Sequence, residues 1–166
     1  MPQIFPGRYA AQSDEPFVVF LIGMRVNRIF ALRSWPRVAA AMPPMIAELK
    51  RDLSLGLLHA EFFVYWRGVG VLQYWRSFEL LHAYAHARNA AHLPAWAEFN
   101  RRIGNNGSVG IWHETYAISP GQYESIYASM PRFGLGAAMQ HLPATGRLES
   151  ARSRIGRENS GDSERV

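Results

Sequence analysis

The segment 17–26, with the sequence FVVFLIGMRV, constrains the fold more than any other, because almost every residue in it is apolar. Alternate side chains of a β-strand point to opposite faces, so a strand here carries apolar side chains on both faces. Such a strand is typical of a sheet that is covered on both sides. The apolar run FVVFLIG is also much shorter than the about 20 residues that a membrane-spanning helix needs. We therefore expect a strand inside a globular domain.

The elements predicted along the rest of the chain follow an order that is typical of the ferredoxin-like fold. In chain order we expect first a strand at 17–26 and then a helix that Ser34 caps and that Pro43 and Pro44 break or kink. Strands at 57–67 and 71–76 follow, joined by a turn at 68–70. A helix at 77–90 and a strand at 109–118 complete the order. This is the βαββαβ pattern of an α+β fold with an antiparallel sheet. Right-handed crossovers place both helices on the same face of that sheet. The other face then needs cover, and the sheet of a second copy supplies it in a dimeric α/β barrel, so we expect a homodimer.

The two ends of the chain differ in composition from this central part. Residues 1–16 contain three prolines and predict an irregular N-terminal arm. Residues 120–130 predict an extra C-terminal helix, because apolar side chains recur there at helical spacing after a proline. Residues 144–166 are charged and lack apolar periodicity, which predicts a disordered tail. The dimeric α/β-barrel domain is therefore expected to span residues 17–143.

Composition excludes several classes of protein. The chain has no cysteine, so disulfides and thiolate chemistry are excluded. The net charge is +5 and Lys50 is the only lysine, but the arginines are scattered rather than clustered, which argues against nucleic-acid binding. The N-terminus lacks the basic and apolar regions of a secretory signal. We expect a cytoplasmic protein that binds neither nucleic acid nor a membrane.

The predicted strand at 109–118 contains two residues that could act as a catalytic base. His113 and Glu114 are adjacent in sequence, so on a regular strand they point to opposite faces and do not form an acid–base pair. A lone histidine such as His113 is more often a hydrogen-bonded core residue than a base. Both residues are retained as catalytic candidates.

Glu114 is predicted to share its face with two aromatic residues, Trp112 and Tyr116. If that face lines a pocket, apolar surroundings would raise the pKa of the carboxyl group and suit it to act as a base. The alternative is a structural ion pair, for which Arg25 and Arg76 are the candidate partners.

Two sets of histidine-containing residues have helical spacing. His92, Trp96 and Asn100 are four residues apart and would form one wall of a pocket if a single helix contained them. The alternative is a capping imidazole beside a core tryptophan. His82 and His86 are also four residues apart, but they belong to a polar helix face, and no metal-binding motif accompanies them, so we predict no metal site.

Four segments together resemble a known family: YWRSFELLHAYA, HLPAWAEFNRRIG, VGIWHETY and MPRFGLGAAMQHLP. They are similar to a family of domains of unknown function that is related to a monooxygenase of the fumagillin pathway. That family belongs to the dimeric α/β-barrel superfamily, and the resemblance covers about residues 17–143. Members of the superfamily include oxygenases without a cofactor, haem enzymes and proteins with no known reaction, so the fold alone does not fix the activity.

The resemblance implies a monooxygenase-like enzyme that acts on a hydrophobic small organic molecule. In a route without a cofactor, Glu114 or His113 would deprotonate the substrate, and the carbanion would react with dioxygen. The substrate-binding residues would be His92, Trp96, Asn100, Trp112, Tyr116 and Arg25. Two alternatives stay open: a haem protein with His92 or His113 as the axial ligand, and a non-catalytic ligand-binding dimer.

Overall fold

The computed structural model describes residues 2–30, 35–87 and 107–155. The chain forms two compact units. The larger unit comprises residues 18–116, and the smaller unit combines residues 1–17 with residues 117–166. Each unit has its own β-sheet, and the two are described separately.

The larger unit has the ferredoxin-like order of elements that the sequence predicts. Its elements are β2 (Phe17–Val26), α1 (Trp35–Arg51), the 3-10 helix η1 (Leu53–Leu55), β3 (Leu57–Tyr65), β4 (Gly68–Trp75), α2 (Phe78–His86) and β5 (Val109–Ile118). The strands lie in the order β3-β4-β2-β5, and β4 is antiparallel to both of its neighbours. Two strands that are adjacent in the sheet, β2 and β5, are therefore far apart in sequence, which brings residues near both ends of the domain together.

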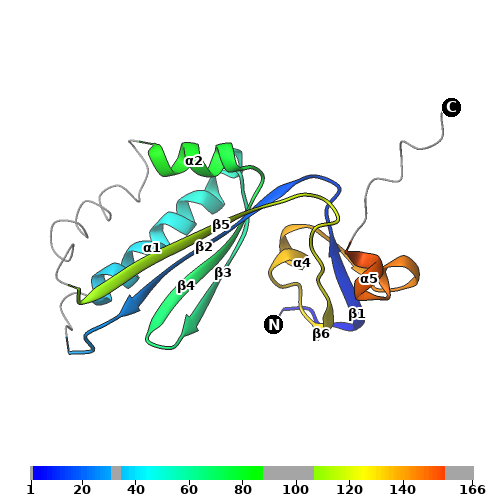
Figure 1. Cartoon of the computed structure of the whole chain (residues 1–166), viewed down its shortest axis with the longest axis horizontal. Helices are drawn as coiled ribbons and strands as arrows, with labels where there is room; N and C mark the ends of the chain where they lie inside the picture. The colour runs from blue at the N-terminus through cyan, green and yellow to red at the C-terminus, as the bar shows by residue number, and fades with distance from the viewer. Residues whose placement is uncertain (1, 31–34, 88–106, 156–166) are drawn as a thin grey trace. The chain divides into compact units, whose positions relative to one another are not determined.

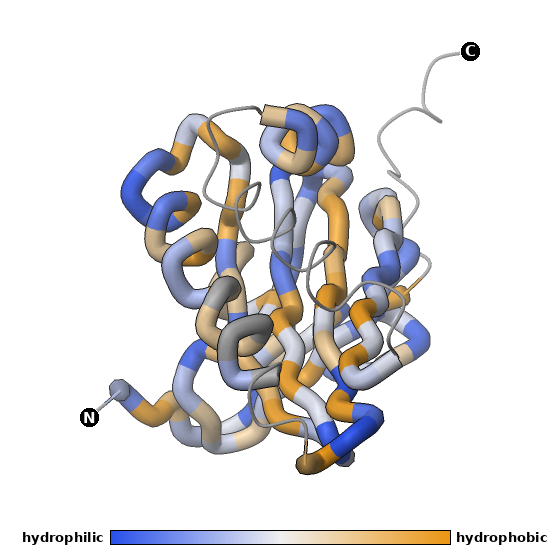
Figure 2. Tube along the Cα trace, turned by 90° about the vertical axis from the view of Figure 1, so that its left-hand side faces the viewer, coloured by the Kyte–Doolittle hydropathy of each residue, from blue (hydrophilic) through white to orange (hydrophobic). Residues whose placement is uncertain are grey.

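Both helices pack on one face of this sheet (Figure 1). The core between them contains Ile46 and Leu49 from α1 and Leu81 and Tyr84 from α2. The sheet contributes five buried residues to this core, namely Val18, Leu57, Ala60, Val71 and Trp75. Hydrophobic residues recur along the strands, whereas the helices carry hydrophilic residues as well (Figure 2). This pattern is the one expected of helices with one face in a core and one in solvent.

Local signals in the sequence explain where several elements begin and end. Ser77 caps α2, because its side-chain oxygen accepts a hydrogen bond from the backbone N–H of Leu80 at 3.3 Å. Gly56 follows η1 with a φ of 94°, a left-handed conformation that favours glycine. The hairpin turn lies at Trp66 and Arg67, two residues earlier than predicted, and Arg67 has a φ of 59°.

The prolines of α1 do not break the helix, so the first of the two predicted effects, a break or a kink, is wrong. The helix runs from Trp35 to Arg51 through Pro43 and Pro44, whose side chains are exposed. Each proline removes one backbone donor, which costs stability. Ile46 and Leu49 follow on the buried side, and their packing on the sheet opposes that cost.

The smaller unit corrects three predictions about the chain ends. Its elements are β1 (Phe5–Gln12), β6 (Tyr127–Met130), α4 (Leu135–Ala138), β7 (Gln140–Pro143), the 3-10 helix η3 (Gly146–Leu148) and α5 (Ala151–Arg154). The strands form a sheet in the order β6-β1-β7. The arm at 1–16 therefore contains a strand, the predicted helix at 120–130 ends in a strand instead, and the tail contains two helical turns before residue 156.

The proline and glycine of β1 explain why the sequence concealed this strand. Pro6 and Gly7 lie where the pairing between β1 and β6 shifts its register, between Phe5 and Arg8. Proline is tolerated at such irregularities because no ladder hydrogen bond is required there. Beyond the irregular part, the pairing of β1 with β7 is regular from Tyr9 to Gln12.

Candidate functional site

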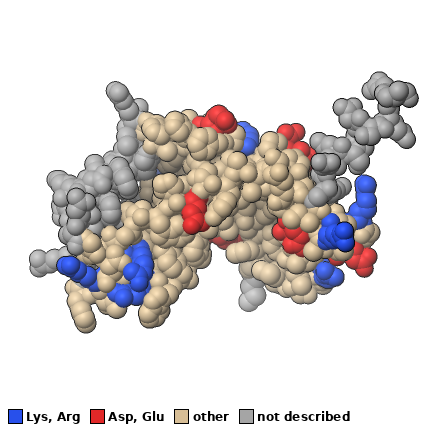
Figure 3. Space-filling view, in the orientation of Figure 1, with Lys and Arg blue, Asp and Glu red and all other residues tan. Residues whose placement is uncertain are grey.

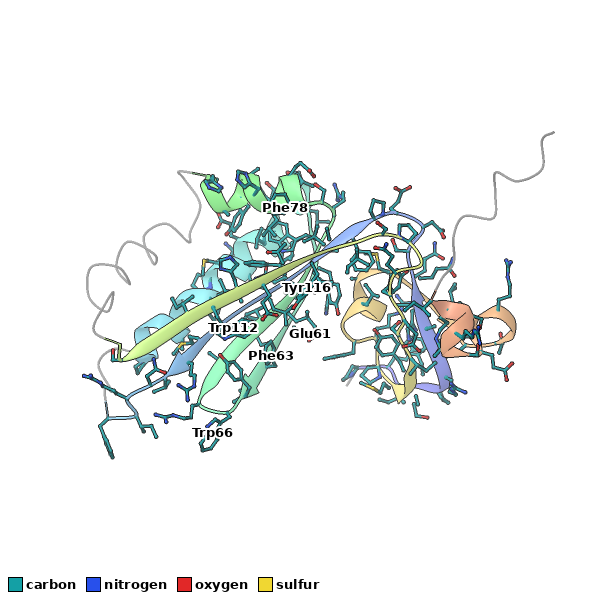
Figure 4. The ribbon with its side chains drawn as sticks, in the orientation of Figure 1. Glu61, Phe63, Trp66, Phe78, Trp112 and Tyr116 are labelled. Carbon is teal, nitrogen blue, oxygen red and sulfur yellow. The ribbon has the colours of Figure 1, made fainter. Side chains whose placement is uncertain are left out.

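The face of the four-stranded sheet that lies opposite α1 and α2 carries the candidate site. We call it the open face. The register of the strands and the contacts of Trp112 place eleven side chains on it: Val19, Leu21, His59, Glu61, Phe63, Tyr65, Leu72, Tyr74, Trp112, Glu114 and Tyr116. Six of these are aromatic or imidazole rings, and two are carboxylates. Glu61, Phe63, Trp112 and Tyr116 lie over one stretch of the sheet (Figure 4).

Glycines let the aromatic rings of the open face lie close against the backbone. A Cβ atom on Gly23 would come within 2.9 Å of the Trp112 indole, and one on Gly70 would come within 2.5 Å of the Phe63 ring. Any larger residue at either position would push the ring away. The sequence therefore places these rings close against the sheet backbone, where Phe63 and Trp112 remain partly exposed.

Tyr65 fixes the orientation of Trp112. The Trp112 Nε1–H donates to the Tyr65 hydroxyl at 2.6 Å, and that hydroxyl donates to the backbone carbonyl of Met24 at 2.7 Å. The rings of Phe63 and Tyr65 lie 5.7 Å apart between centroids. We call Phe63, Tyr65 and Trp112 the aromatic patch, and its polar groups are satisfied within the sheet.

Two carboxylates on the open face each have a defined partner. Glu61 Oε1 lies 2.7 Å from His59 Nε2, and the Tyr116 hydroxyl donates to Glu114 Oε2 at 2.6 Å. The hydrogen bond to Glu114, and then its negative charge, raise the pKa of the Tyr116 phenol. The phenol therefore stays protonated, and can donate to the Glu114 carboxylate, up to a higher pH than an unperturbed tyrosine would.

The structure brings together three of the predicted site residues and separates a fourth. Trp112, Glu114 and Tyr116 share the open face, as the alternation of the strand predicts. His113 lies on the opposite face, where its ring centroid is 5.8 Å from that of Phe20. Glu114 and His113 are thus confirmed to point apart.

The other predicted residues take no described part in the open-face site. Arg25 lies near the end of β2, and its guanidinium donates to the Asn27 side chain at 2.7 Å. It is therefore bonded to an amide rather than to Glu114. His92, Trp96 and Asn100 lie outside the described residues.

Among the residues of the open face that were not predicted as site residues, four lie on β3. They are His59, Glu61, Phe63 and Tyr65, which recur at every second position in the sequence HAEFFVY. The alternation rule that was applied to β5 would have placed them on one face of β3 as well. That they share a face with Glu114 depends on the sheet order, which no local pattern reveals.

The histidines of α2 have surroundings unlike those of a metal site. The rings of His82 and His86 stack with 4.0 Å between centroids, and His86 Nδ1 lies 2.8 Å from the backbone carbonyl of His82. Across the described ranges, no three histidine, cysteine, aspartate or glutamate side chains are grouped as metal ligands would be. Within the same ranges, no helix has the length and apolar character needed to cross a membrane.

The sequence matches one protein family and one curated protein. Residues 17–135 match the family described as "Monooxygenase af470-like". A curated protein of Aspergillus fumigatus named Monooxygenase af470 is 30% identical to this chain over 148 residues, which are 79% of this chain and 50% of that protein. The chain therefore spans half the length of this curated relative.

A solved structure supports the fold independently of the sequence. The structure of an aldoxime dehydratase (OxdRE), crystallised in complex with butyraldoxime, superposes with a TM-score of 0.66. The superposed part makes up 83% of this chain and 43% of the aldoxime dehydratase chain, at 12% sequence identity. Identity this low speaks for a shared α+β fold and not for a shared reaction.

Proposed function

The chain belongs to the Monooxygenase af470-like family, and from that premise we propose that it is a monooxygenase-like enzyme for a hydrophobic small organic molecule bound on the open face. The observation that carries this proposal is the aromatic patch, which lies on the same sheet face as two hydrogen-bonded carboxylates, Glu61 and Glu114. Flat aromatic side chains favour a flat apolar ligand. Carboxylates beside such a ligand can accept a proton from it.

Glu114 is the proposed general base, in a route that needs no cofactor. The carboxylate removes a proton from an acidic C–H bond of the substrate, and Tyr116 keeps the carboxylate oriented. The carbanion then gives two electrons to dioxygen and forms a C–O bond, which yields a hydroperoxide once a proton is added. Loss of water leaves a carbonyl group, so that one oxygen atom enters the product and the other leaves as water. The substrate itself supplies all the electrons.

A second copy of the chain is proposed to complete the site. The open face is not covered by α1 or α2, and Glu114 and Tyr116 are exposed. Two such faces packed against each other would enclose the ligand and exclude water from the carboxylates.

Haem is the alternative cofactor, and the described residues fit it poorly. An axial histidine must reach the ligand-binding face, yet His113 lies on the helix-covered face beside Phe20. His59 is on the open face, but its Nε2 atom is hydrogen-bonded to the Glu61 carboxylate. His92, the other expected ligand, lies outside the described residues. A visible spectrum of protein produced with iron and a haem precursor checks this alternative.

Oxygen uptake by the purified protein tests the proposed reaction. The probes are anthrone and related compounds with an acidic C–H bond between aromatic or carbonyl groups, and product is followed as the ketone. Glu114→Gln is expected to lower kcat about 100-fold or more while leaving ligand affinity similar, because only the base is lost. Glu61→Gln tests the second carboxylate, and Glu15→Gln in the smaller unit is the control.

His113 and Glu114 lie on opposite faces of β5, so variants at these two positions distinguish the proposed base from its neighbour in sequence. His113→Gln should retain the rate, since His113 points away from the open face. Loss of activity in His113→Gln but not in Glu114→Gln would contradict the proposal. So would a folded dimer that takes up no oxygen with any of the probes, in which case the non-catalytic ligand-binding alternative is favoured.

A further inference from the structure

Two loops meet at one end of the four-stranded sheet. One follows β2 and contains residues 27–30, and the other is the turn of Trp66 and Arg67 between β3 and β4. The backbone N–H of Val26 donates to the carbonyl of Arg67 at 2.7 Å, and the Arg67 guanidinium donates to the carbonyl of Asn27 at 2.6 Å. These bonds hold the two loops side by side.

Large apolar side chains project from these loops into solvent. Phe30 is 96% exposed and Trp66 is 81% exposed, and they are joined by Val64 at 83% and Ile29 at 56%. Trp66 stands at the tip of the hairpin, clear of the helices (Figure 4). Single exposed apolar residues are ordinary, but several together on adjoining loops mark an interaction surface. We call residues 28–30, 64, 66 and 67 with Arg25 the hairpin-end surface.

The same surface is uniformly basic. Arg25, Arg28 and Arg67 lie in the segments 21–30 and 62–70, which contain no aspartate or glutamate. Figure 3 shows Lys and Arg atoms gathered at this end of the sheet, with no Asp or Glu atoms among them. Arg25 and Arg67 both bond to Asn27, which holds their charges close to the two loops.

Contrary to the expectation from composition that the protein binds no membrane, we propose that the hairpin-end surface docks on the surface of an anionic lipid bilayer. Trp66 and Phe30 would enter the boundary between headgroups and acyl chains, where aromatic side chains are favoured. Arg25 and Arg28, whose side chains are exposed, would face the lipid phosphates, to which guanidinium groups donate well, while Arg67 holds the two loops together.

The shape of the surface favours a bilayer over a protein partner. A stable protein interface usually buries about 800 Å² on each side in a close-fitting patch. Here Phe30 and Trp66 stand in two adjoining loops, beside the exposed Arg25 and Arg28, and neither segment contains an acidic residue, which suits shallow insertion into a soft anionic surface. This inference is independent of the reaction proposed for the open face.

Vesicle sedimentation tests the proposal with the full chain. The protein is mixed with vesicles of phosphatidylcholine alone or of phosphatidylcholine with phosphatidylserine, at low and high salt. Binding to the anionic vesicles is expected, and it should weaken with salt because the arginine contribution is screened. The double variant Phe30→Ser with Trp66→Ser should bind at least about tenfold more weakly, and Arg28→Glu about fivefold more weakly.

Two matched variants serve as controls. Leu53→Ser alters another exposed apolar residue, 67% exposed in η1, and Arg152→Glu reverses an exposed charge in α5. Both should bind vesicles like the unaltered protein. Equal binding by the Phe30/Trp66 variant, or no binding of the unaltered protein to anionic vesicles, overturns the proposal. A change of oligomeric mass in that variant, measured by light scattering, would assign the surface to a protein interface and overturn it as well.

Discussion

Among single residues, His141 on β7 has the surroundings least expected for its chemistry. Its ring stacks on Tyr9 with 4.6 Å between centroids, and it meets Phe5 edge-on at 5.0 Å and Tyr127 at 5.8 Å. Both ring nitrogens are buried and lack a hydrogen-bond partner within the described residues. Burial, followed by the positive charge of Arg132, lowers the pKa of His141. A neutral imidazole is thus held in an aromatic cage, where its polar atoms cost stability.

His141→Phe is predicted to stabilise the protein and to alter its acid sensitivity. An unsatisfied buried polar group costs about 1–3 kcal/mol, and phenylalanine keeps the ring contacts without that cost. In the unfolded chain the imidazole titrates near pH 6.5, whereas in the folded protein its pKa is lower. Between these two values the unfolded chain binds more protons, so stability falls as the pH falls, and it is unaffected above about pH 7.

Urea unfolding at a series of pH values measures both effects. His141→Phe should raise the midpoint and flatten the decline of stability below about pH 6.5. His82→Phe, at an exposed histidine of α2, is the control and should leave the decline in place. A His141→Phe variant that is less stable at neutral pH would show that the imidazole makes a favourable bond.

The side chains of the open face show how far residue patterns reach. The alternation of β5 predicted that Trp112, Glu114 and Tyr116 share a face and that His113 does not, and both predictions are confirmed. The same rule did not predict that Glu61 joins them. The pairing β3-β4-β2-β5 depends on contacts distant in sequence, so a local pattern cannot assign faces of different strands to one site.

At the scale of elements, the segment after β7 is the clearest departure from expectation. Arg154 of α5 is buried, and its Nε donates to Glu124 Oε1 at 3.0 Å, with its Nη2 on the same oxygen. Its Nη1 donates to the carbonyls of Leu148 and Glu149 at 2.7 and 2.9 Å. One guanidinium thus joins the loop before β6 to the turn at η3. A charged, serine-rich sequence suggested disorder, because apolar periodicity gives no sign of order built around a single buried arginine.

Arg154→Ala is predicted to destabilise the smaller unit by about 2 kcal/mol or more, since hydrogen bonds to a charged group are lost and Glu124 loses its partner. Arg154→Lys should recover only part of this, because an ammonium group cannot reproduce the fork. Thermal melting measures the change. Arg152→Ala alters an exposed neighbour and should have little effect. Equal midpoints for Arg154→Ala and Arg152→Ala would mean that the segment contributes nothing to stability.

Element prediction succeeded where hydrophobic patterns were long and failed where strands were short. The limits of β2 and β5 were predicted to the residue. The four-residue strands β6 and β7 are too short to show a period, and each pairs with β1 from the other end of the chain. Tyr127 illustrates the outcome: its hydroxyl accepts a hydrogen bond from Gly136 N–H at 3.0 Å, a tertiary contact rather than a helical one.

At the scale of the whole molecule, the two faces of the four-stranded sheet differ in how they are covered. Val18 and Phe20 of β2 contact the core under α1 and α2, whereas Val19 and Leu21 point to the open face. The open face spans four strands that lie about 4.8 Å apart and extend over about 27 Å, which gives a flat area of roughly 500 Å². The largest apolar patch on a typical monomer is about 300–600 Å² and is often functional, so an open face of this size marks an interaction surface.

The protein is therefore predicted to be a homodimer that joins through the open face, and adjacent residues of β3 provide a matched test. Phe63→Asp places a charge on the open face, whereas Phe62→Asp places the same charge on the opposite face, where Phe62 is 52% exposed. Light scattering on dilute protein should give a dimer mass for the unaltered chain and for Phe62→Asp. Phe63→Asp should give a monomer mass, because a buried unpaired carboxylate costs several kcal/mol in each half of a two-fold interface. Dissociation by Phe62→Asp instead would move the interface to the other face. An unaltered chain that is monomeric at micromolar concentration would remove both the dimer and the enclosed site that depends on it.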